Sequence, residues 1–325
     1  MKKILLVVII FSVCLISGRP LDQFPEAIIS NGLIKARLYL PDIKDGYYRG
    51  ARFDWSGVIP ELEYKGHSYF GQWFEKYSPT LHDAIMGPVE DFSPVGYDEA
   101  RTGESFLKIG IGMIAKPEES KYFFANPYQI VNRGVWKVKK KSTRVEFIQT
   151  LTDKDYSYNY KKTVELLKGK AEMVLSHSLE NTGKKAIETN VYNHNFFVID
   201  QQPIGPDYLI RFPFTPTGEP QGKGDFGKIQ DNQIKFLKEL SSNDHLQYLS
   251  LLGFSNSSKD YDISIENHKT GAAVRITCDQ PLSKLAFWSA LKTLCPEPYI
   301  HIKINPGETF TWKIYYQFYT CDIAN

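Results

Sequence analysis

The sequence lacks apolar runs long enough to cross a membrane. Its first apolar run, from Ile4 to Val13, is shorter than the about 20 residues that a membrane-spanning helix needs. Two lysines precede this run, and the small residues Ser17-Gly18 follow it before Arg19-Pro20 ends the pattern. This order is typical of a secretory signal peptide. We therefore expect residues 1–18 to be a signal peptide and the protein to be exported, to a periplasm or to the extracellular space; a buried N-terminal strand is the alternative.

An excess of charge of one sign is also missing. The chain has 39 Lys and Arg against 37 Asp and Glu, and loss of residues 1–18 would remove Lys2 and Lys3 and leave 37 of each. A neutral chain has neither the basic surface that nucleic acid requires nor a polybasic patch for anionic membranes. We expect a neutral or mildly polar ligand and no nucleic-acid partner.

Cysteine is scarce, with four in the whole chain. Cys14 lies in the expected signal peptide and could carry a lipid anchor, although Phe11-Ser12-Val13 before it fits a lipoprotein signal poorly. Cys278, Cys295 and Cys321 form no CxxC pair, which argues against a zinc site. An odd number allows at most one disulfide, and the sequence does not say which cysteines pair.

Signatures of nucleotide, hydride and metal chemistry are absent as well. The sequence contains no GxSxG, HExxH, P-loop or GxGxxG motif in a credible context. The segment Met86–Phe92 with His82-Asp83 before it is acidic, but its oxygens do not follow the regular spacing of a calcium loop. We expect no metal and no cofactor.

Long helical patterns are scarce, whereas alternating apolar and polar residues recur throughout the chain. At the C-terminus, Phe310, Trp312, Ile314, Tyr316 and Phe318 share one face, after the turn Asn305-Pro306-Gly307. Similar strands are expected at residues 33–40, 145–151, 173–179 and 272–278. Strands separated by turns rather than helices predict an all-β, two-sheet antiparallel β-sandwich, with residues 19–325 as a single domain. The Gly- and Pro-rich segment 215–227 is expected to be a surface loop.

Two segments draw attention to titratable residues. In the strand expected after Gly183, His194 shares a face with Tyr192 and Phe196, which would suit a cleft that binds a sugar. Glu297 lies between two prolines, which restrict its backbone and could fix a catalytic carboxylate. Taken singly, a structural histidine and a solvent-facing turn glutamate are the simpler interpretations.

Further polar residues are candidates for contacts with ligand hydroxyl groups. They lie in the segment Tyr47–Gly57, in the segment around Met86–Phe92 and in a turn after the histidine strand. An Arg–Asp ion pair or a turn aspartate would explain some of them equally well. The candidates are Arg52, Asp54, His82, Glu90, Asp91 and Asp207.

Three segments together resemble the aldose 1-epimerases of the galactose mutarotase-like superfamily. Asn193–Phe197 is similar to the family's histidine strand, Leu285–Tyr299 to its tryptophan strand followed by a Glu-Pro motif, and Asn305–Thr309 to its Pro-Gly-Glu turn before the last strand. The N-terminal half departs from the family because the usual Asn-Arg pair on an early loop is missing, and His82 does not align clearly with the family's second histidine. The N-terminal segments look like an exported bacterial subgroup.

The resemblance implies a β-supersandwich and a carbohydrate ligand, either a mono- or an oligosaccharide. It implies that His194 is the general acid and Glu297 the general base of anomer interconversion, and that a nearby carboxylate keeps the imidazole charged. Tyr192, Phe196 or Trp288 would form an apolar platform for the sugar. Two alternatives stay open: a non-catalytic carbohydrate-binding protein on the same fold, and a polysaccharide lyase-like enzyme.

Overall fold

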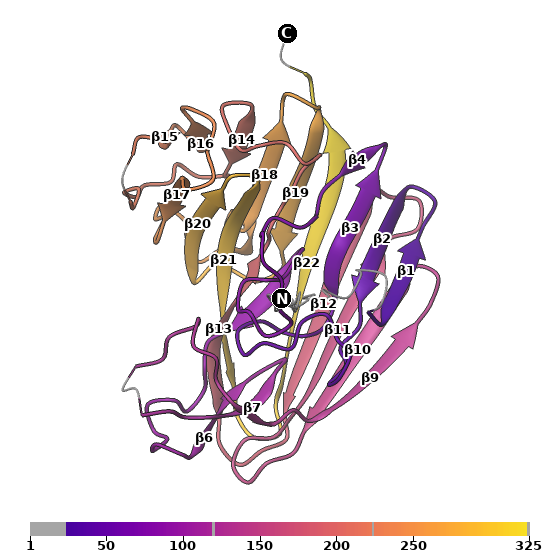
Figure 1. Cartoon of the computed structure of the whole chain (residues 1–325), viewed down its shortest axis with the longest axis vertical. Coiled ribbons are helices and arrows are strands. Elements are labelled where there is room, and N and C mark those ends of the chain that lie inside the picture. The colour runs from indigo at the N-terminus through magenta and orange to yellow at the C-terminus, as the bar shows by residue number, and fades with distance from the viewer. Residues whose placement is uncertain (1–23, 119–120, 223, 324–325) are drawn as a thin grey trace, which may run out of the picture.

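Ten strands form the largest sheet of the protein (Figure 1). The computed structural model describes residues 24–118, 121–222 and 224–323, so the expected signal peptide and Cys14 lie outside the described residues. The strands of this sheet, in order across it, are β15 (Gly227–Gln230), β16 (Gln233–Phe236), β14 (Tyr208–Arg211), β18 (Asp262–Asn267), β19 (Ala272–Cys278), β22 (Thr309–Thr320), β12 (Glu172–Asn181), β11 (Tyr158–Leu166), β10 (Arg144–Leu151) and β9 (Val135–Lys140).

Three smaller sheets complete the structure. The four-stranded sheet contains β1 (Glu26–Ser30), β2 (Ile34–Tyr39), β3 (Val58–Tyr64) and β4 (His67–Ser68). The five-stranded sheet runs in the order β17 (His245–Tyr248), β20 (Lys284–Ala290), β21 (Thr293–Ile304), β13 (Ile187–His194) and β5 (Val89–Phe92). The three-stranded sheet contains β6 (Ser105–Lys108), β7 (Gly112–Ala115) and β8 (Ile130–Asn132).

All pairs of neighbouring strands are antiparallel. In the described residues the sole named helix is a short 3-10 turn, η2 (Ser258–Asp260). The expectation of an all-β antiparallel sandwich is therefore confirmed. Of the loop expected at residues 215–227, the described residues 215–222 and 224–226 contain isolated bridges at Thr217 and Gln221 and no longer strand, and β15 begins at Gly227.

The four-stranded and five-stranded sheets lie over the same side of the ten-stranded sheet and make a second layer (Figure 1). The backbone joins these two sheets, because Val198 N–H donates to the Tyr69 carbonyl at 3.0 Å and Asp200 N–H to the Ser68 carbonyl at 2.9 Å. The core fills the space between the layers, and strands of both layers contribute buried apolar residues to it.

The alternation of β22 shows why the sequence folds in this way. Trp312, Ile314, Tyr316 and Phe318 are buried, while the residues between them are exposed or half-buried. Each side chain on the inner face removes apolar surface from water, and the pattern of period two makes this possible in a strand. A second group of buried aromatic residues lies around Tyr47, Phe53 and Phe196, beside the five-stranded sheet.

The cysteines at positions 278, 295 and 321 are all free thiols, so the disulfide that the odd count allowed is not formed among them. Within the described residues, no helix has the length and apolar character needed to cross a membrane.

Candidate functional site

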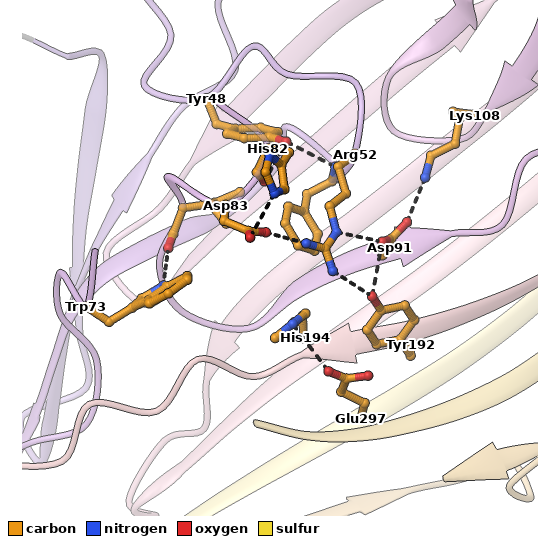
Figure 2. A network of polar contacts seen from close by, with 12 residues as sticks. Tyr48, Arg52, Trp73, His82, Asp83, Asp91, Lys108, Tyr192, His194 and Glu297 are labelled. Atoms are coloured by element: carbon orange, nitrogen blue, oxygen red, sulfur yellow. Dashed lines mark hydrogen bonds and ion pairs between the residues drawn. The ribbon is translucent and has the colours of Figure 1, made fainter. Parts of the chain in front are cut away.

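The five-stranded sheet brings the two catalytic candidates together. His194 ends β13, and Glu297 lies in the middle of β21, which pairs with β13 in antiparallel register. The imidazole Nε2 of His194 lies 3.3 Å from Oε1 of Glu297, and both side chains are largely buried. Figure 2 shows the two groups facing each other. The two residues are about 100 positions apart in the sequence, and the antiparallel pairing of their strands brings them together as one acid–base pair.

The prolines beside Glu297 lie in a strand and not in the turn that a solvent-facing glutamate would occupy. Pro296 and Pro298 are opposite Phe287 and Leu285 of β20. The Pro296 carbonyl accepts a hydrogen bond of 2.7 Å from the buried Asn195 side chain. This bond ties the backbone next to Glu297 to the backbone next to His194, so the two candidates are fixed relative to each other.

Burial controls the ionisation of the pair. It raises the pKa of Glu297 to about 7, with Arg52 acting in the opposite direction and Asp91 in the same direction. It also lowers the pKa of His194 well below its ordinary value, and the positive charge of Arg52 adds to this effect. Near neutral pH the pair therefore consists of a neutral imidazole and a carboxyl group that is easily protonated. The expectation that a carboxylate keeps His194 charged is wrong, because burial and the charge of Arg52 both favour the neutral imidazole.

A stack of three aromatic rings supports His194. The imidazole lies on Phe196, with ring centroids 3.8 Å apart and an interplanar angle of 5°, and Trp73 stacks on Phe196 at 5.0 Å and 13°. Two rings of this size do not fit on one face of Phe196, so they cover opposite faces. Phe196 is 1% exposed. Phe196 lines the cavity, but its ring faces are taken by His194 and Trp73, so a role as a flat sugar platform stays a prediction that this packing does not favour.

Arg52 is the centre of a second, separate group of side chains (Figure 2). Its Nε donates to Asp91 at 3.2 Å, one terminal nitrogen pairs with Asp83, and the other donates to the Tyr192 hydroxyl at 3.3 Å. The guanidinium carbon also lies 4.4 and 4.1 Å from the ring centroids of Phe53 and Phe124. Two carboxylates, a hydroxyl and two aromatic rings thus hold this cation in place.

Asp91 connects this group to a buried lysine. Lys108 donates to one oxygen of Asp91 at 2.6 Å, while Arg52 and the hydroxyl of Tyr192 bind the other oxygen, the hydroxyl at 3.1 Å. Burial lowers the pKa of Lys108, and Asp91 opposes this change. Two cations thus hold a single carboxylate at the edge strand β5.

A cavity of about 410 Å³ lies over the five-stranded sheet and contains both groups. Of the residues predicted from the sequence, Arg52, Asp91, Tyr192, His194, Phe196, Trp288 and Glu297 line it. The wall combines carboxylates and basic groups with exposed aromatic and aliphatic surface. The wall also contains side chains that were not predicted from the sequence, namely Trp73, Asp83, Phe124, Lys284, Ala286 and Tyr299.

Three expected ligand contacts are not in the cavity. Asp54 is 1% exposed, and its carboxylate binds Ser56 and Tyr160. Asp207 lies in an exposed turn whose backbone carbonyl accepts from His268 N–H at 2.8 Å. Glu90 is fully buried between the two layers. None of these three residues lines the cavity, so the structure does not bring them to the two catalytic candidates.

The alternation of β5 explains why Glu90 and its neighbour differ. Successive side chains of a strand point to opposite faces, so Asp91 points to the cavity while Glu90 points into the core. There Glu90 pairs with Lys162, and its other oxygen lies 2.7 Å from Nε2 of His177. Asn193, the residue before His194, also donates to Glu90 at 3.4 Å. This ionic core lies directly behind the site.

His82 is near the site but does not line the cavity. Its Nε2 lies 2.9 Å from Asp83, and its ring contacts Phe124 edge to face. It therefore supports Asp83 rather than facing a ligand directly.

Several residues of the site were not predicted from the sequence. Trp73 and Phe124 lie in loops without a repeating pattern, and Lys108 and Lys284 have no motif around them. Asp83 follows His82 directly and belongs to the same acidic segment, which was the one available signal. Within the described ranges, no group of three His, Cys, Asp or Glu side chains could hold a metal ion.

The sequence matches no protein-family model and no curated protein. Solved structures with the same fold do exist. A protein from Synechocystis sp. PCC 6803 superposes with a TM-score of 0.57 at 12% identity, over 97% of this chain and 100% of that one. A protein from Escherichia coli K12 described as a candidate aldose 1-epimerase superposes with a TM-score of 0.55 at 14% identity, over 91% and 99% of the two chains.

A galactose mutarotase-like protein from Lactobacillus casei ATCC 334 superposes with a TM-score of 0.54 at 14% identity, over 90% of this chain and 100% of that one. Such low identities establish the architecture and leave the activity to be argued from the site. The chain has the galactose mutarotase-like fold, as the resemblance of its three motifs implied.

Proposed function

We propose that this protein is an aldose 1-epimerase, which interconverts the α and β anomers of a sugar by opening and reclosing its hemiacetal ring. The observation that carries the proposal is the contact of 3.3 Å between His194 and Glu297 in an aromatic-lined cavity. The mutarotase-like fold supports it.

The reaction needs an acid and a base close to each other. The hydroxyl oxygen O1 and the ring oxygen O5 are both bonded to the anomeric carbon, so they lie within a few ångströms of each other. One proton must leave O1 while another reaches O5. The C1–O5 bond then breaks, the C1–O1 bond becomes a carbonyl, and rotation about C1–C2 presents the other face for closure. Two adjacent titratable groups with opposite protonation states suit this exchange.

The ionisation of the pair indicates where the proton starts. With the pKa of Glu297 raised and that of His194 lowered, the carboxyl holds the proton and the imidazole is free to accept one. Glu297 then protonates O5 while His194 takes the proton of O1–H. Ring closure reverses both transfers and restores the neutral pair. The family resemblance assigns the roles the other way: Glu297 would take the proton of O1–H and His194 would protonate O5, a scheme that begins from the charged form of the pair.

The neighbouring residues position the sugar. Among the charged residues of the Arg52 group, Asp83 has the most exposed side chain, at 36%, and it can accept hydrogen bonds from hydroxyl groups. Arg52 binds Asp83, Asp91 and Tyr192, so we assign it to holding these three side chains in place. Trp288 lines the cavity on the other side of the pair and is half-buried, so it can present apolar surface to the sugar.

Exchange spectroscopy of the anomeric protons tests the proposal, because it measures anomer interconversion at equilibrium for any reducing sugar. We expect the protein to accelerate exchange of D-glucose or D-galactose. Glu297→Gln and His194→Asn should each reduce the catalysed rate by roughly 10²–10⁴-fold. Matched controls lie on the same two strands: His301 and Glu188 form an exposed pair at 3.4 Å, and His301→Asn and Glu188→Gln should leave the rate within about twofold.

Two outcomes contradict the proposal. If sugars bind without faster exchange, the chain is a carbohydrate-binding protein on this fold. If Glu297→Gln and His194→Asn exchange anomers as fast as the control variants, the pair does not carry the chemistry.

A further inference from the structure

Lys284 is a cation of the cavity wall that acts on Glu297 through its charge but makes no direct ion pair with it. Its side chain is exposed, and its ammonium group lies 4.9 Å from the ring centroid of Tyr299. No ion pair involves Lys284 in the part of the chain that the structure describes. Arg52 and Lys108, by contrast, both bind carboxylates directly.

The charges around the cavity leave Lys284 in excess. Arg52, Lys108 and Lys284 are three cations, and Asp83 and Asp91 are two carboxylates. Glu297 balances the third cation only when it is ionised, whereas the proposed reaction begins with this carboxyl protonated. The reactive form of the site thus carries one uncompensated positive charge, and a ligand with one negative charge would neutralise it.

Strand register places Lys284 diagonally from Glu297. Ala286 is directly opposite Glu297, and Lys284 is opposite Tyr299, two residues further along β21. Diagonal partners in an antiparallel pair lie roughly 7–8 Å apart, which a lysine side chain can span. The residue of β20 opposite Glu297 is an alanine, which adds only one methyl group, and the charge of Lys284 lowers the pKa of Glu297.

The position next to Glu297 corresponds to a definite part of a sugar. Glu297 is assigned to the ring oxygen O5, and the carbon bonded to O5 on the side away from the anomeric centre is C5. In a hexuronic acid this carbon carries a carboxylate, and in a neutral hexose it carries a hydroxymethyl group. A carboxylate at this point would lie toward Lys284.

We propose that the sugar accepted by this site is a uronic acid, whose C5 carboxylate pairs with Lys284. The proposal rests on the epimerase function above and names its substrate class. A single lysine matches a carboxylate with one negative charge. A phosphate on the exocyclic carbon attached to C5 carries about −1.5 to −2 charges near pH 7. One lysine would leave part of this charge unpaired beside Asp83 and Asp91.

Comparison of D-glucuronate with D-glucose tests the proposal. In exchange spectroscopy at low ionic strength, we expect the kcat/KM for D-glucuronate to exceed that for D-glucose by about tenfold, because hydrogen bonds to charged groups are the stronger ones. Lys284→Gln should lower the ratio of the two values at least about fivefold. Lys284→Arg, which keeps the positive charge, should retain most of the ratio of the two kcat/KM values. Lys228→Gln, which removes an exposed lysine of β15, is the control and should leave the ratio as in the wild type.

The outcomes separate the substrate class from the activity. Equal kcat/KM values for the two sugars, or a ratio unchanged by Lys284→Gln, overturn the uronate proposal and leave the epimerase function standing. A preference for D-glucose 6-phosphate over D-glucuronate overturns it as well. If the protein accelerates anomer exchange of neither sugar, the epimerase function fails, and calorimetric binding then tests the carboxylate site. Tighter binding of D-glucuronate than of D-glucose that depends on Lys284 supports this site, and equal binding of the two sugars overturns it.

Discussion

The imidazole of His194 lies flat on the ring of Phe196, at a centroid distance of 3.8 Å. Phe196 adopts a φ of 38°, in the left-handed region that bulky residues rarely occupy. The buried Asn195 holds this backbone, because its amide donates to the Pro296 carbonyl at 2.7 Å and its oxygen accepts from the Tyr316 hydroxyl at 2.8 Å. The strained residue thus supports a reactive one, a pattern found at functional sites.

Phe196 should therefore keep His194 neutral. In Phe196→Ala the imidazole loses its stacked neighbour and gains water, so its pKa should rise toward the ordinary value of 6.5. A titration of the His194 ring protons by NMR measures this change. We also expect a loss of stability of roughly 3–5 kcal/mol, as for other large-to-small core substitutions. Phe196→Leu keeps most of the volume if the alanine variant does not fold, and an unchanged pKa in both variants would contradict the role given to this ring.

The pH dependence of anomer exchange should follow Glu297. Its pKa of about 7 means that the proton needed for O5 is lost as the pH rises above this value. We expect kcat/KM to fall by about tenfold per pH unit on the alkaline side. On the acid side it should stay high through the usual histidine range, because the pKa of His194 is lowered. A profile that rises from pH 6 to pH 8 would contradict this protonation scheme.

The same carboxyl should make the free energy of unfolding depend on pH. Its pKa is raised from 4.5 to about 7 in the folded state, so its contribution is fully present below about 4.5 and is lost as the pH rises through about 7. Relative to Glu297→Gln, the wild type should lose roughly 3 kcal/mol across this window, since one pKa unit corresponds to about 1.4 kcal/mol. Urea titrations of both proteins at several pH values measure the difference, and parallel curves would show that Glu297 is not buried as described.

Some of the site could be predicted from sequence because strands alternate and prolines restrict the backbone. The alternation of β13 placed Tyr192 and His194 on one face, and both line the cavity. The fold followed from the same pattern in β10, β12, β19 and β22. In each of these strands, the alternation of neighbouring residues was enough to predict the strand and the side chains that share a face.

Other parts of the site depend on contacts that no local rule contains. Asp91 and Glu90 are neighbours in an acidic segment, and the register of β5 with β13, which puts Asp91 opposite Tyr192, decides which of them faces the cavity. The covering of Phe196 by Trp73 requires a loop more than 100 residues earlier in the chain. The neutral state of His194 follows from burial, which the assembled fold creates.

The ionic core behind the site should be costly to break. Glu90 and Lys162 are both fully buried, and although burial opposes it, Lys162 and His177 hold the pKa of Glu90 at about 2. Lys162→Met leaves a buried carboxylate without its cation, and we expect a loss of roughly 3–5 kcal/mol of stability in urea. The double variant Glu90→Leu with Lys162→Met removes both charges and should cost clearly less than the sum of the two single changes.

A surface pair provides the control for this experiment. Lys303 and Glu188 are 2.9 Å apart with exposed side chains, and Lys303→Met should cost no more than about 1 kcal/mol because water solvates the remaining carboxylate. Asn193, the residue before His194, donates to Glu90, so Lys162→Met should also slow anomer exchange although Lys162 touches no ligand. If Lys162→Met is as mild as Lys303→Met, or if the double variant equals the sum of its parts, the charges of the core do not act as a unit and do not hold the site in place.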